Sequence, residues 1–424
     1  MSTRNGDPDP MTKVVVVGAG PAGIAAVWRA AQSQAQVTLI DPHPRPGGQI
    51  WLHADEAAAP KEAKPWLDKL DRLPVTRHFG STVIDILPSV VRMQSESGGL
   101  EYVEFDKLIL APGAQELFLP FPGWTLPYIM GAGGALALLR GGMPVKGLRI
   151  AVAGSGPLLF AVAGKLAQAG ARIIAISEQT SRRRLLGFGV GTLMHNPGKI
   201  LEGIRHARHY LPSPFYTNTW IKEARGDSRV REVTLTNGKR LHRLKCDLVA
   251  CGFGLVSSGA LAVLAGCDQQ SGSTVVDRFQ QTSVKNIFCA GEITGIGGVD
   301  LSVIEGEIAG LAAAGNESEA SRCFPKLEKQ RKFARWLNKS FALKAQLKDM
   351  PDEDTIICRC EDITYGQLKN LADQCSAKLY TRCGMGPCQG RICSNALKFL
   401  LGWDLNTVRP PVFPAKIGDL ISTP

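Results

Sequence analysis

Apolar residues near the beginning of the chain occur in short unbroken runs, which predict buried strands. Val14–Val17 is such a run, and Val37–Ile40 is a second one that ends at the acidic residue Asp41. Between them, Ile24–Ala31 has the composition and length of a helix. The order strand, helix, strand predicts a βαβ unit at the beginning of the chain.

The same pattern returns in the middle of the chain. Leu148–Ala153 predicts another buried strand, a helix should follow it, and Ile173–Ser177 predicts the next strand. Farther on, Val230–Thr236 and Arg240–Leu244 flank an Asn-Gly pair, which is typical of a hairpin turn. A second Rossmann-like unit is therefore expected here.

Two apolar segments have some features of membrane-spanning or membrane-surface segments. Asp247–Gly266 is apolar, but it is rich in Gly and Ser and begins at an acid, so we predict a buried strand and loop. Residues 316–350 show a partly helical apolar periodicity. We predict a helix docked on the preceding domain; the alternative is a helix that docks on a partner or a membrane surface. The apolar positions of this second segment are Phe324, Leu327, Phe333, Trp336, Leu337, Phe341 and Leu347.

Length and charge narrow the class of protein. The 424 residues suffice for two or three domains, and the net charge of +11 is scattered apart from Arg182–Arg184 and residues 326–348. Because no focused basic patch or nucleic-acid motif occurs, nucleic-acid binding is disfavoured; acidic partners, nucleotides or an anionic membrane surface fit better. The absence of a signal peptide and the clustering of the cysteines favour a cytoplasmic location, with peripheral contact at the inner face of the membrane as an alternative.

The sequence Gly-Ala-Gly-Pro-Ala-Gly follows the first strand directly. Gly18 permits the tight turn, Gly20 lets the backbone approach a pyrophosphate, and Gly23 lets helix and strand pack closely. Asp41 stands at about the offset of the acid that holds the adenosine ribose. The predicted dinucleotide-binding residues are Gly18, Gly20, Pro21, Ala22, Gly23 and Asp41.

A second glycine loop follows the middle strand, with Gly154, Gly156 and, at the end of the next strand, Glu178. It departs from the nicotinamide pattern, because Leu159 replaces the third glycine and Ala161 replaces the acid that usually follows. We therefore expect a Rossmann-like fold in which NAD(P) binding is disfavoured. Arg182–Arg184 could hold a nucleotide phosphate or be solvated. His195 is either a contact at a cofactor edge or, as is more common, structural.

Cysteines near the C-terminal end form two groups. Cys358 and Cys360 flank one arginine, and Cys383, Cys388 and Cys393 follow at equal intervals. Four thiolates are what a [2Fe–2S] cluster needs. The equal spacing does not decide which two residues of the second group would bind, but the glycines between them leave room for backbone N–H groups to point at sulfur. A four-cysteine zinc site and ordinary buried thiols are the alternatives.

This segment resembles the bacterioferritin-associated-ferredoxin-like [2Fe–2S] domain over roughly the last seventy residues. The resemblance rests on Cys-Arg-Cys-Glu-Asp and on the later Gly-Met-Gly-Pro-Cys-Gln-Gly-Arg-x-Cys run. It implies that the ligands are Cys358, Cys360, Cys388 and Cys393, and that Cys383 is a spare thiol near the cluster.

Three further segments, Pro46–Gln49, Leu110–Ala114 and Asn286–Glu292, resemble FAD oxidoreductases of the glutathione and thioredoxin reductase type. The resemblance implies FAD contacts from Gly48, Gln49, Ala111, Gly113, Gly291 and Glu292, and a helix N-terminus after Gly298 that faces the flavin. Glu292 is one methylene longer than the family's aspartate. No Cys-x-x-Cys pair occurs before residue 358, so electrons from the flavin should leave through the iron–sulfur centre.

The whole layout resembles the FAD/[2Fe–2S] α-type subunits of heteromeric amine and amino-acid dehydrogenases. This implies an electron-transfer subunit that works with a glycine- or sarcosine-oxidase-like flavoprotein subunit and, in some complexes, a small ferredoxin-like subunit. The substrate would be an opine, D-hydroxyproline, proline or a glycine-like compound. We find no acid/base constellation for the substrate chemistry itself. The alternatives are a stand-alone NAD(P)H:acceptor oxidoreductase and a non-catalytic iron–sulfur module.

The expected fold class is α/β, with two Rossmann-like dinucleotide-binding domains and a small C-terminal [2Fe–2S] domain. The FAD-binding domain is discontinuous, at 11–130 and 246–315. The second Rossmann-like insert spans 131–245, a helical linker spans 316–350, and the [2Fe–2S] domain spans 351–424.

Overall fold

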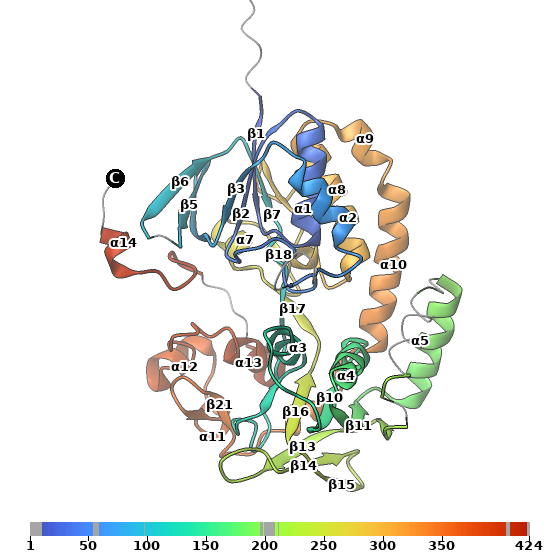
Figure 1. The fold of residues 1–424 in the computed structure, drawn as a ribbon. Coiled ribbons are helices and arrows are strands. Elements are labelled where there is room, and N and C mark those ends of the chain that lie inside the picture. The colour runs from blue at the N-terminus through green and yellow to red at the C-terminus, as the bar shows by residue number, and fades with distance from the viewer. Residues whose placement is uncertain are drawn as a thin grey trace, which may run out of the picture. The chain divides into compact units, whose positions relative to one another are not determined.

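The computed structural model describes residues 11–53, 59–96, 98–195, 198, 208–210, 212–403 and 408–421 (Figure 1). The chain divides into two compact units. The first contains Met1–Ala114, Ser257–Ala334 and Thr407–Pro424, and the second contains Gln115–Val256 and Arg335–Asn406. The finer division into four parts with the bounds given above stays a prediction.

The first unit is built on a parallel sheet of five strands in the order β20-β7-β1-β2-β3. The valine run forms its centre, since Val14 pairs with Val37 on one side and with Lys107 on the other. Val14 and Val16 are fully buried, as expected for a strand that is covered on both faces. The strands are β1 (Lys13–Val17), β2 (Gln36–Asp41), β3 (Thr76–Phe79), β7 (Lys107–Leu110) and β20 (Ile287–Cys289).

Two helices of this unit, α1 (Pro21–Gln32) and α8 (Val299–Ala313), lie side by side (Figure 1). Glycines make this close approach possible. A Cβ on Gly306 would lie 2.0 Å from the carbonyl oxygen of Ala22, and one on Gly310 would lie 2.2 Å from that of Ala26. Small residues on both helices therefore bring the beginning of α8 close to the first glycine loop.

The first unit also contains a separate antiparallel sheet of three strands, in the order β4-β5-β6. Its further elements are α2 (Lys64–Asp71), β4 (Thr82–Leu87), β5 (Val90–Gln94), β6 (Leu100–Glu104), α7 (Ala260–Leu264), β18 (Gln269–Gln270), β19 (Ser273–Thr274), the 3₁₀ turn η1 (Glu292–Thr294), α9 (Glu317–Ser321) and α14 (Ile417–Ile421).

The second unit repeats the design with a parallel sheet in the order β12-β11-β10-β16-β9. The predicted hairpin is present as β14 paired with β15, and Gly238 at its turn has a φ of 86°. These elements are β9 (Ile129–Gly131), α3 (Ala132–Arg140), β10 (Arg149–Gly154), α4 (Leu158–Gln168), β11 (Arg172–Glu178), α5 (Arg182–His195), β12 (Phe215–Thr217), β13 (Trp220–Arg225), β14 (Glu232–Thr236), β15 (Leu241–Lys245) and β16 (Leu248–Gly252).

The cysteine-rich segment belongs to the second unit. It has a small core of its own, in which Ile357, Leu368 and Leu397 are buried, and Trp124 Nε1 of the Rossmann-like part donates a hydrogen bond to Ile356 O at 2.6 Å. Its elements are η2 (Ala345–Asp349), β21 (Ile356–Cys358), β22 (Ile363–Thr364), α11 (Tyr365–Leu368), α12 (Gln374–Thr381) and α13 (Cys393–Leu401). Three of the junctions between the units fall in β8 (Ala114–Glu116), β17 (Leu255–Ser257) and α10 (Phe324–Ser340), and the fourth lies outside the described residues.

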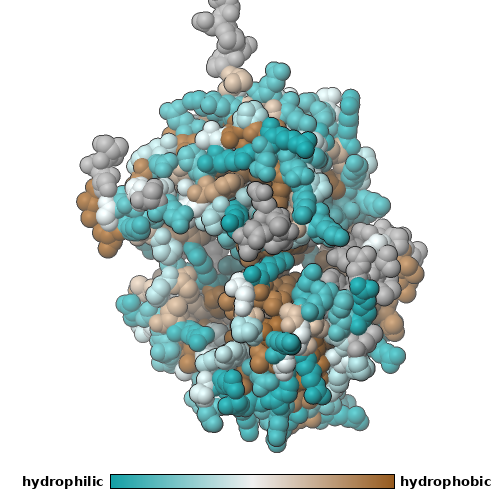
Figure 2. All heavy atoms as spheres, in the orientation of Figure 1, coloured by the Kyte–Doolittle hydropathy of each residue, from teal (hydrophilic) through white to brown (hydrophobic). Residues whose placement is uncertain are grey.

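Among the described residues, no helix is long and apolar enough to cross a membrane. The apolar stretch after Asp247 begins with the buried strand β16, as predicted, but the part predicted as a loop contains the short strand β17 and the short helix α7. Exposed apolar side chains gather along α5, where Leu186, Val190 and Leu193 follow at helical spacing (Figure 2). These three side chains remain exposed among the described residues.

Candidate functional site

The first glycine loop has the geometry that its sequence predicts. A Cβ on Gly18 would lie 2.2 Å from Ala111 O, and one on Gly23 would lie 1.7 Å from Gly18 O, so neither position admits a side chain. In contrast, a Cβ on Gly20 would meet nothing within 4 Å. Gly20 is the N-cap of α1 and Pro21 follows it, so the open space lies at a helix N-terminus, which attracts phosphate.

Asp41 ends β2 beside this loop. Its Oδ2 accepts a hydrogen bond from Ala19 N at 2.5 Å, and its Oδ1 accepts one from His43 N at 2.8 Å. His43 Nδ1 lies 2.9 Å from the same Oδ1, and this hydrogen bond raises the pKa of His43. The acid is thus held in place by backbone N–H groups, at the position where a ribose is expected.

Two further predicted segments lie against the loop. Gly47 N donates to Ala19 O at 2.7 Å, and a Cβ on Gly48 would lie 3.0 Å from Gly20 Cα. Gln49 comes next, and its amide Nε2 lies 3.1 Å from His43 Nε2. Ala111 N donates to Val17 O at 2.8 Å, which places Ala111–Gly113 at the end of the central strands. The structure therefore brings residues from three separate segments to one edge of the sheet.

Gly291 and Glu292 complete this edge. Gly291 has a φ of 82°, and a Cβ there would lie 2.8 Å from the Ala22 side chain. Glu292 Oε1 accepts a hydrogen bond from Gly298 N, the N-cap of α8, at 2.8 Å. Its Oε2 is buried and meets no donor at hydrogen-bonding geometry within the described residues, and burial raises the pKa of Glu292. An orphaned buried acceptor beside an open phosphate cradle fits a ligand that carries both phosphate and hydroxyl groups.

The second glycine loop has the same tight turn as the first, but the acid at the end of the next strand contacts it differently. A Cβ on Gly154 would lie 1.9 Å from Gly252 O, whereas one on Gly156 meets nothing within 4 Å. Glu178 is fully buried, with Oε2 accepting from Gly156 N and Oε1 from Thr180 N, both at 2.8 Å, and burial raises its pKa. Leu159 is a fully buried core residue. Glu178 thus already occupies the N–H of Gly156, the glycine of this loop where a Cβ would meet open space.

A segment that follows α10 lies against this second loop, and sequence reasoning missed it. Ser155 Oγ donates to Phe341 O at 3.1 Å, and the buried Gln179 side chain donates to Ala342 O at 3.3 Å and accepts from Lys344 N at 3.2 Å. These contacts span 186, 163 and 165 residues of sequence, so no local pattern could reveal them. His195 ends α5, and its side chain lies outside the described residues.

The cysteines of both groups come together. The sulfurs of Cys358, Cys383 and Cys393 all lie within 4.8 Å of one another, in buried positions. Cys360 and Cys388 interact with each other through their side chains. Gly386 packs on Cys360, since a Cβ there would lie 2.2 Å from Cys360 Cβ. The two groups thus share one place in the fold, and Cys383 is part of it.

Backbone N–H groups surround one of these sulfurs. Burial alone would raise the pKa of Cys388, but hydrogen bonds from Cys360 and from the backbone N–H groups of Gly390, Ile392 and Arg391 lower it below its usual value. Gly390 has a φ of 78°, which allows the turn. N–H groups directed at sulfur stabilise thiolate, the form that binds metal. The donor set therefore fits a thiolate-bound metal centre.

Known proteins match most of the length of this chain. Residues 12–317 match the pyridine nucleotide-disulphide oxidoreductase family. The chain belongs to this family. An opine oxidase subunit of Rhizobium meliloti is 28% identical over 97% of this chain and 87% of its own. Hydrogen cyanide synthase subunit HcnB of Pseudomonas aeruginosa is 30% identical over 94% of this chain and 96% of its own.

A solved structure, that of L-proline dehydrogenase from P. horikoshii, covers 99% of this chain and 82% of its own with a TM-score of 0.69 and 20% identity, a likeness that concerns the fold. The predicted α/β fold with two Rossmann-like domains is confirmed. As a member of the pyridine nucleotide-disulphide oxidoreductases, the protein is an FAD-dependent oxidoreductase. The resemblance to α-type subunits of heteromeric amine and amino-acid dehydrogenases is likewise confirmed, because relatives named as opine oxidase and hydrogen cyanide synthase subunits match nearly the whole chain.

Proposed function

We propose that this chain is the FAD- and [2Fe–2S]-containing electron-transfer subunit of a heteromeric dehydrogenase. In this proposal a partner flavoprotein oxidises a small amine, imino acid or amino acid by two electrons. The present chain accepts these electrons and passes them on singly. The final acceptor lies outside the chain.

The gathering of five thiols from Cys358 to Cys393 carries this proposal. A disulfide reductase of the same family would need a redox Cys-x-x-Cys pair near its flavin, and the sequence has none before residue 358. The cysteines lie instead in a separate segment with its own small core and with N–H groups directed at sulfur. We assign the cluster to Cys358, Cys360, Cys388 and Cys393, following the sequence motif.

We assign the FAD to the edge of the first sheet. Gly18, Gly20 and Gly23 would admit the pyrophosphate, Asp41 would hold the adenosine ribose, and Glu292 Oε2 would accept from a ribityl hydroxyl. The other contacts of this assignment are Pro21, Ala22, Gly48, Gln49, Ala111, Gly113 and Gly291. When bound, FAD supplies two-electron chemistry and a [2Fe–2S] cluster supplies one-electron transfer.

Relatives point to the substrate class and to the partner. Two of them are named as subunits of opine oxidase and of hydrogen cyanide synthase, and a protein of the same fold is an L-proline dehydrogenase. We therefore propose a glycine- or sarcosine-oxidase-like flavoprotein as the partner, and an opine, proline, D-hydroxyproline or glycine-like compound as the substrate.

The experiment is an anaerobic reductive titration of the purified chain, followed by visible absorbance and EPR. We expect uptake of about three electrons per chain, two by FAD and one by the cluster. Cys358→Ser should take up only the two electrons of FAD. The exposed Cys375, which lies on α12 outside the cysteine cluster, provides a matched Cys→Ser control that should behave as the wild type. An uptake of two electrons by the wild type, or zinc in place of iron, would reject the proposal.

A second candidate is a stand-alone NAD(P)H:acceptor oxidoreductase. The intact parallel sheet and the open position at Gly156 favour it. The buried Leu159 opposes it, and so does Glu178 Oε2, because its hydrogen bond occupies the N–H of Gly156 that a phosphate would need. We rank it second for this reason.

A further inference from the structure

The acid Glu305 on α8 has no role in the assignments above, although it is almost completely buried, with 2% of its side chain exposed. An ionised carboxylate in such a place is strongly destabilising unless hydrogen bonds and a counter-charge compensate for its desolvation. Burial raises the pKa of Glu305, whereas Thr294, Arg331 and Gly291 oppose this shift. Glu305 therefore links the turn that contains Gly291 and Thr294 to Arg331.

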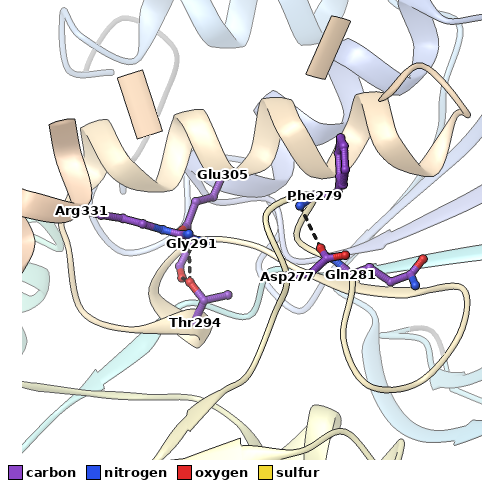
Figure 3. A network of polar contacts seen from close by, with 7 residues as sticks. All are labelled: Asp277, Phe279, Gln281, Gly291, Thr294, Glu305 and Arg331. Atoms are coloured by element: carbon purple, nitrogen blue, oxygen red, sulfur yellow. Dashed lines mark hydrogen bonds and ion pairs between the residues drawn. The ribbon is translucent and has the colours of Figure 1, made fainter. Parts of the chain in front are cut away.

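One oxygen of Glu305 holds the turn that carries Glu292. Oε2 accepts a hydrogen bond from Gly291 N at 3.0 Å and another from Thr294 Oγ1 at 2.7 Å. Thr294 Oγ1 also lies 2.9 Å from Gly291 O. Figure 3 shows both ends of this turn directed at the Glu305 carboxylate. A single buried oxygen thus fixes the turn at its first and last residues.

The other oxygen meets a cation from a different helix. Arg331 on α10 donates to Glu305 Oε1 at 3.2 Å, and 26% of the arginine side chain is exposed. When the side-chain amide of Gln280 is oriented with its oxygen toward Arg331, this oxygen accepts a hydrogen bond from the Arg331 guanidinium at 3.1 Å. The amide nitrogen then donates to Cys289 O at 3.2 Å. Arg331 therefore reaches the turn through Glu305 and reaches the end of β20, just before the turn, through Gln280.

The segment that presents Gln280 is itself fixed. Asp277 Oδ1 accepts from Phe279 N at 2.8 Å and from Gln281 N at 3.0 Å, as Figure 3 shows. Gln280, between these two residues, is fully buried. The network consequently joins three elements around one short turn, and the turn contains the carboxylate whose Oε2 has no partner at hydrogen-bond geometry among the described residues.

We propose that Glu305 and Arg331 are a positioning pair for the flavin, which fixes the turn from Gly291 to Thr294 and with it the orphaned oxygen of Glu292. The inference rests on the proposed FAD site. Neither residue is assigned a contact with the cofactor. The pair places one buried negative and one positive charge beside the turn, so each charge should also act on the flavin, which gains negative charge when it is reduced.

The test uses Arg331→Gln, Glu305→Gln and the double variant, measured for the FAD dissociation constant and the flavin midpoint potential. Arg331→Gln should weaken FAD binding about tenfold or more and lower the potential, because it leaves an uncompensated negative charge. Glu305→Gln should also weaken binding but raise the potential, because it leaves the positive charge. The double variant should return the potential toward that of the wild type.

Arg29→Gln is the matched control, because Arg29 forms ion pairs with Glu307 of the same helix α8 and with Glu319, outside the turn. It should change neither FAD affinity nor potential. Arg331→Lys keeps the charge and should keep the wild-type potential, and Glu305→Gln carries the test if Arg331→Gln does not fold. If the single variants Arg331→Gln and Glu305→Gln shift affinity and potential no more than Arg29→Gln does, while the wild type holds FAD, the positioning role is rejected and the FAD site stands. A wild-type protein without affinity for FAD would reject both.

Discussion

Ala19 N donates a hydrogen bond to Asp41 Oδ2 at 2.5 Å, so the acid that ends β2 is tied to the first glycine loop. In the second Rossmann-like sheet, the longer Glu178 reaches one residue farther, to Gly156 N. Asp41 makes no hydrogen bond to Gly20 N, so this N–H group can meet a phosphate. Glu178 accepts from Gly156 N, which is the corresponding glycine of the second loop. This difference favours the first loop over the second as a phosphate site.

Gly20→Val tests the first loop. The backbone of Gly20 is extended and a Cβ there meets nothing within 4 Å, so the fold should accept the side chain. The valine would, however, fill the space assigned to the pyrophosphate. Overpacking of this kind costs about 1–3 kcal/mol, so FAD affinity should fall roughly fivefold to 150-fold. Flavin content of the purified protein and its dissociation constant measure the effect.

Gly134→Val is a suitable comparison, because Gly134 lies in α3 and a Cβ there also meets nothing within 4 Å. This variant should keep its FAD. Full flavin occupancy in Gly20→Val would show that the pyrophosphate lies elsewhere.

NADH and NADPH should reduce the flavin slowly or not at all. The physical reasons are the buried Leu159 in place of a glycine and the hydrogen bond by which Glu178 Oε2 already occupies the N–H of Gly156. Anaerobic stopped-flow absorbance at the flavin band measures the rate. Rapid bleaching by either nucleotide would make the stand-alone reductase the better assignment.

The sequence predicts the parts of this fold that depend on local pattern. The valine run, the glycine loops and the Asn-Gly hairpin each specify their own conformation, and the structure has all of them. It does not reveal contacts between distant segments, such as Phe341 with Ser155 or Arg331 with Glu305. A lone buried acid such as Glu305 has no recognisable sequence motif. Its role depends on contacts with the Gly291–Thr294 turn and with α10, which form only when the chain folds. The glycine pair Gly306 and Gly310 is a signal in the sequence that α8 approaches another backbone closely.

The stability of the first unit should depend on pH through His43. The hydrogen bond to Asp41 raises the pKa of His43 above its ordinary value of 6.5. A raised pKa in the folded state gives a stabilisation that is complete below the unfolded pKa and is lost as the pH rises through the folded value. Urea midpoints of wild type and His43→Gln should therefore differ more at about pH 5.5 than at about pH 9. An equal difference at both pH values would contradict this linkage.

The last prediction concerns which thiols bind iron. Cys358, Cys360, Cys388 and Cys393 should each be required, because four thiolates complete the two irons of a [2Fe–2S] cluster. Cys383 should be dispensable, although its sulfur lies within 4.8 Å of those of Cys358 and Cys393. Single Cys→Ser variants, compared by iron and sulfide content and by EPR after reduction, separate the two sets, with Cys375→Ser as the control for an exposed cysteine of the same segment. All of them should retain FAD, since the FAD assignment uses residues of the other unit. If Cys383→Ser loses the cluster while Cys393→Ser keeps it, the second pair of ligands is Cys383 and Cys388, and the assignment by sequence motif is wrong.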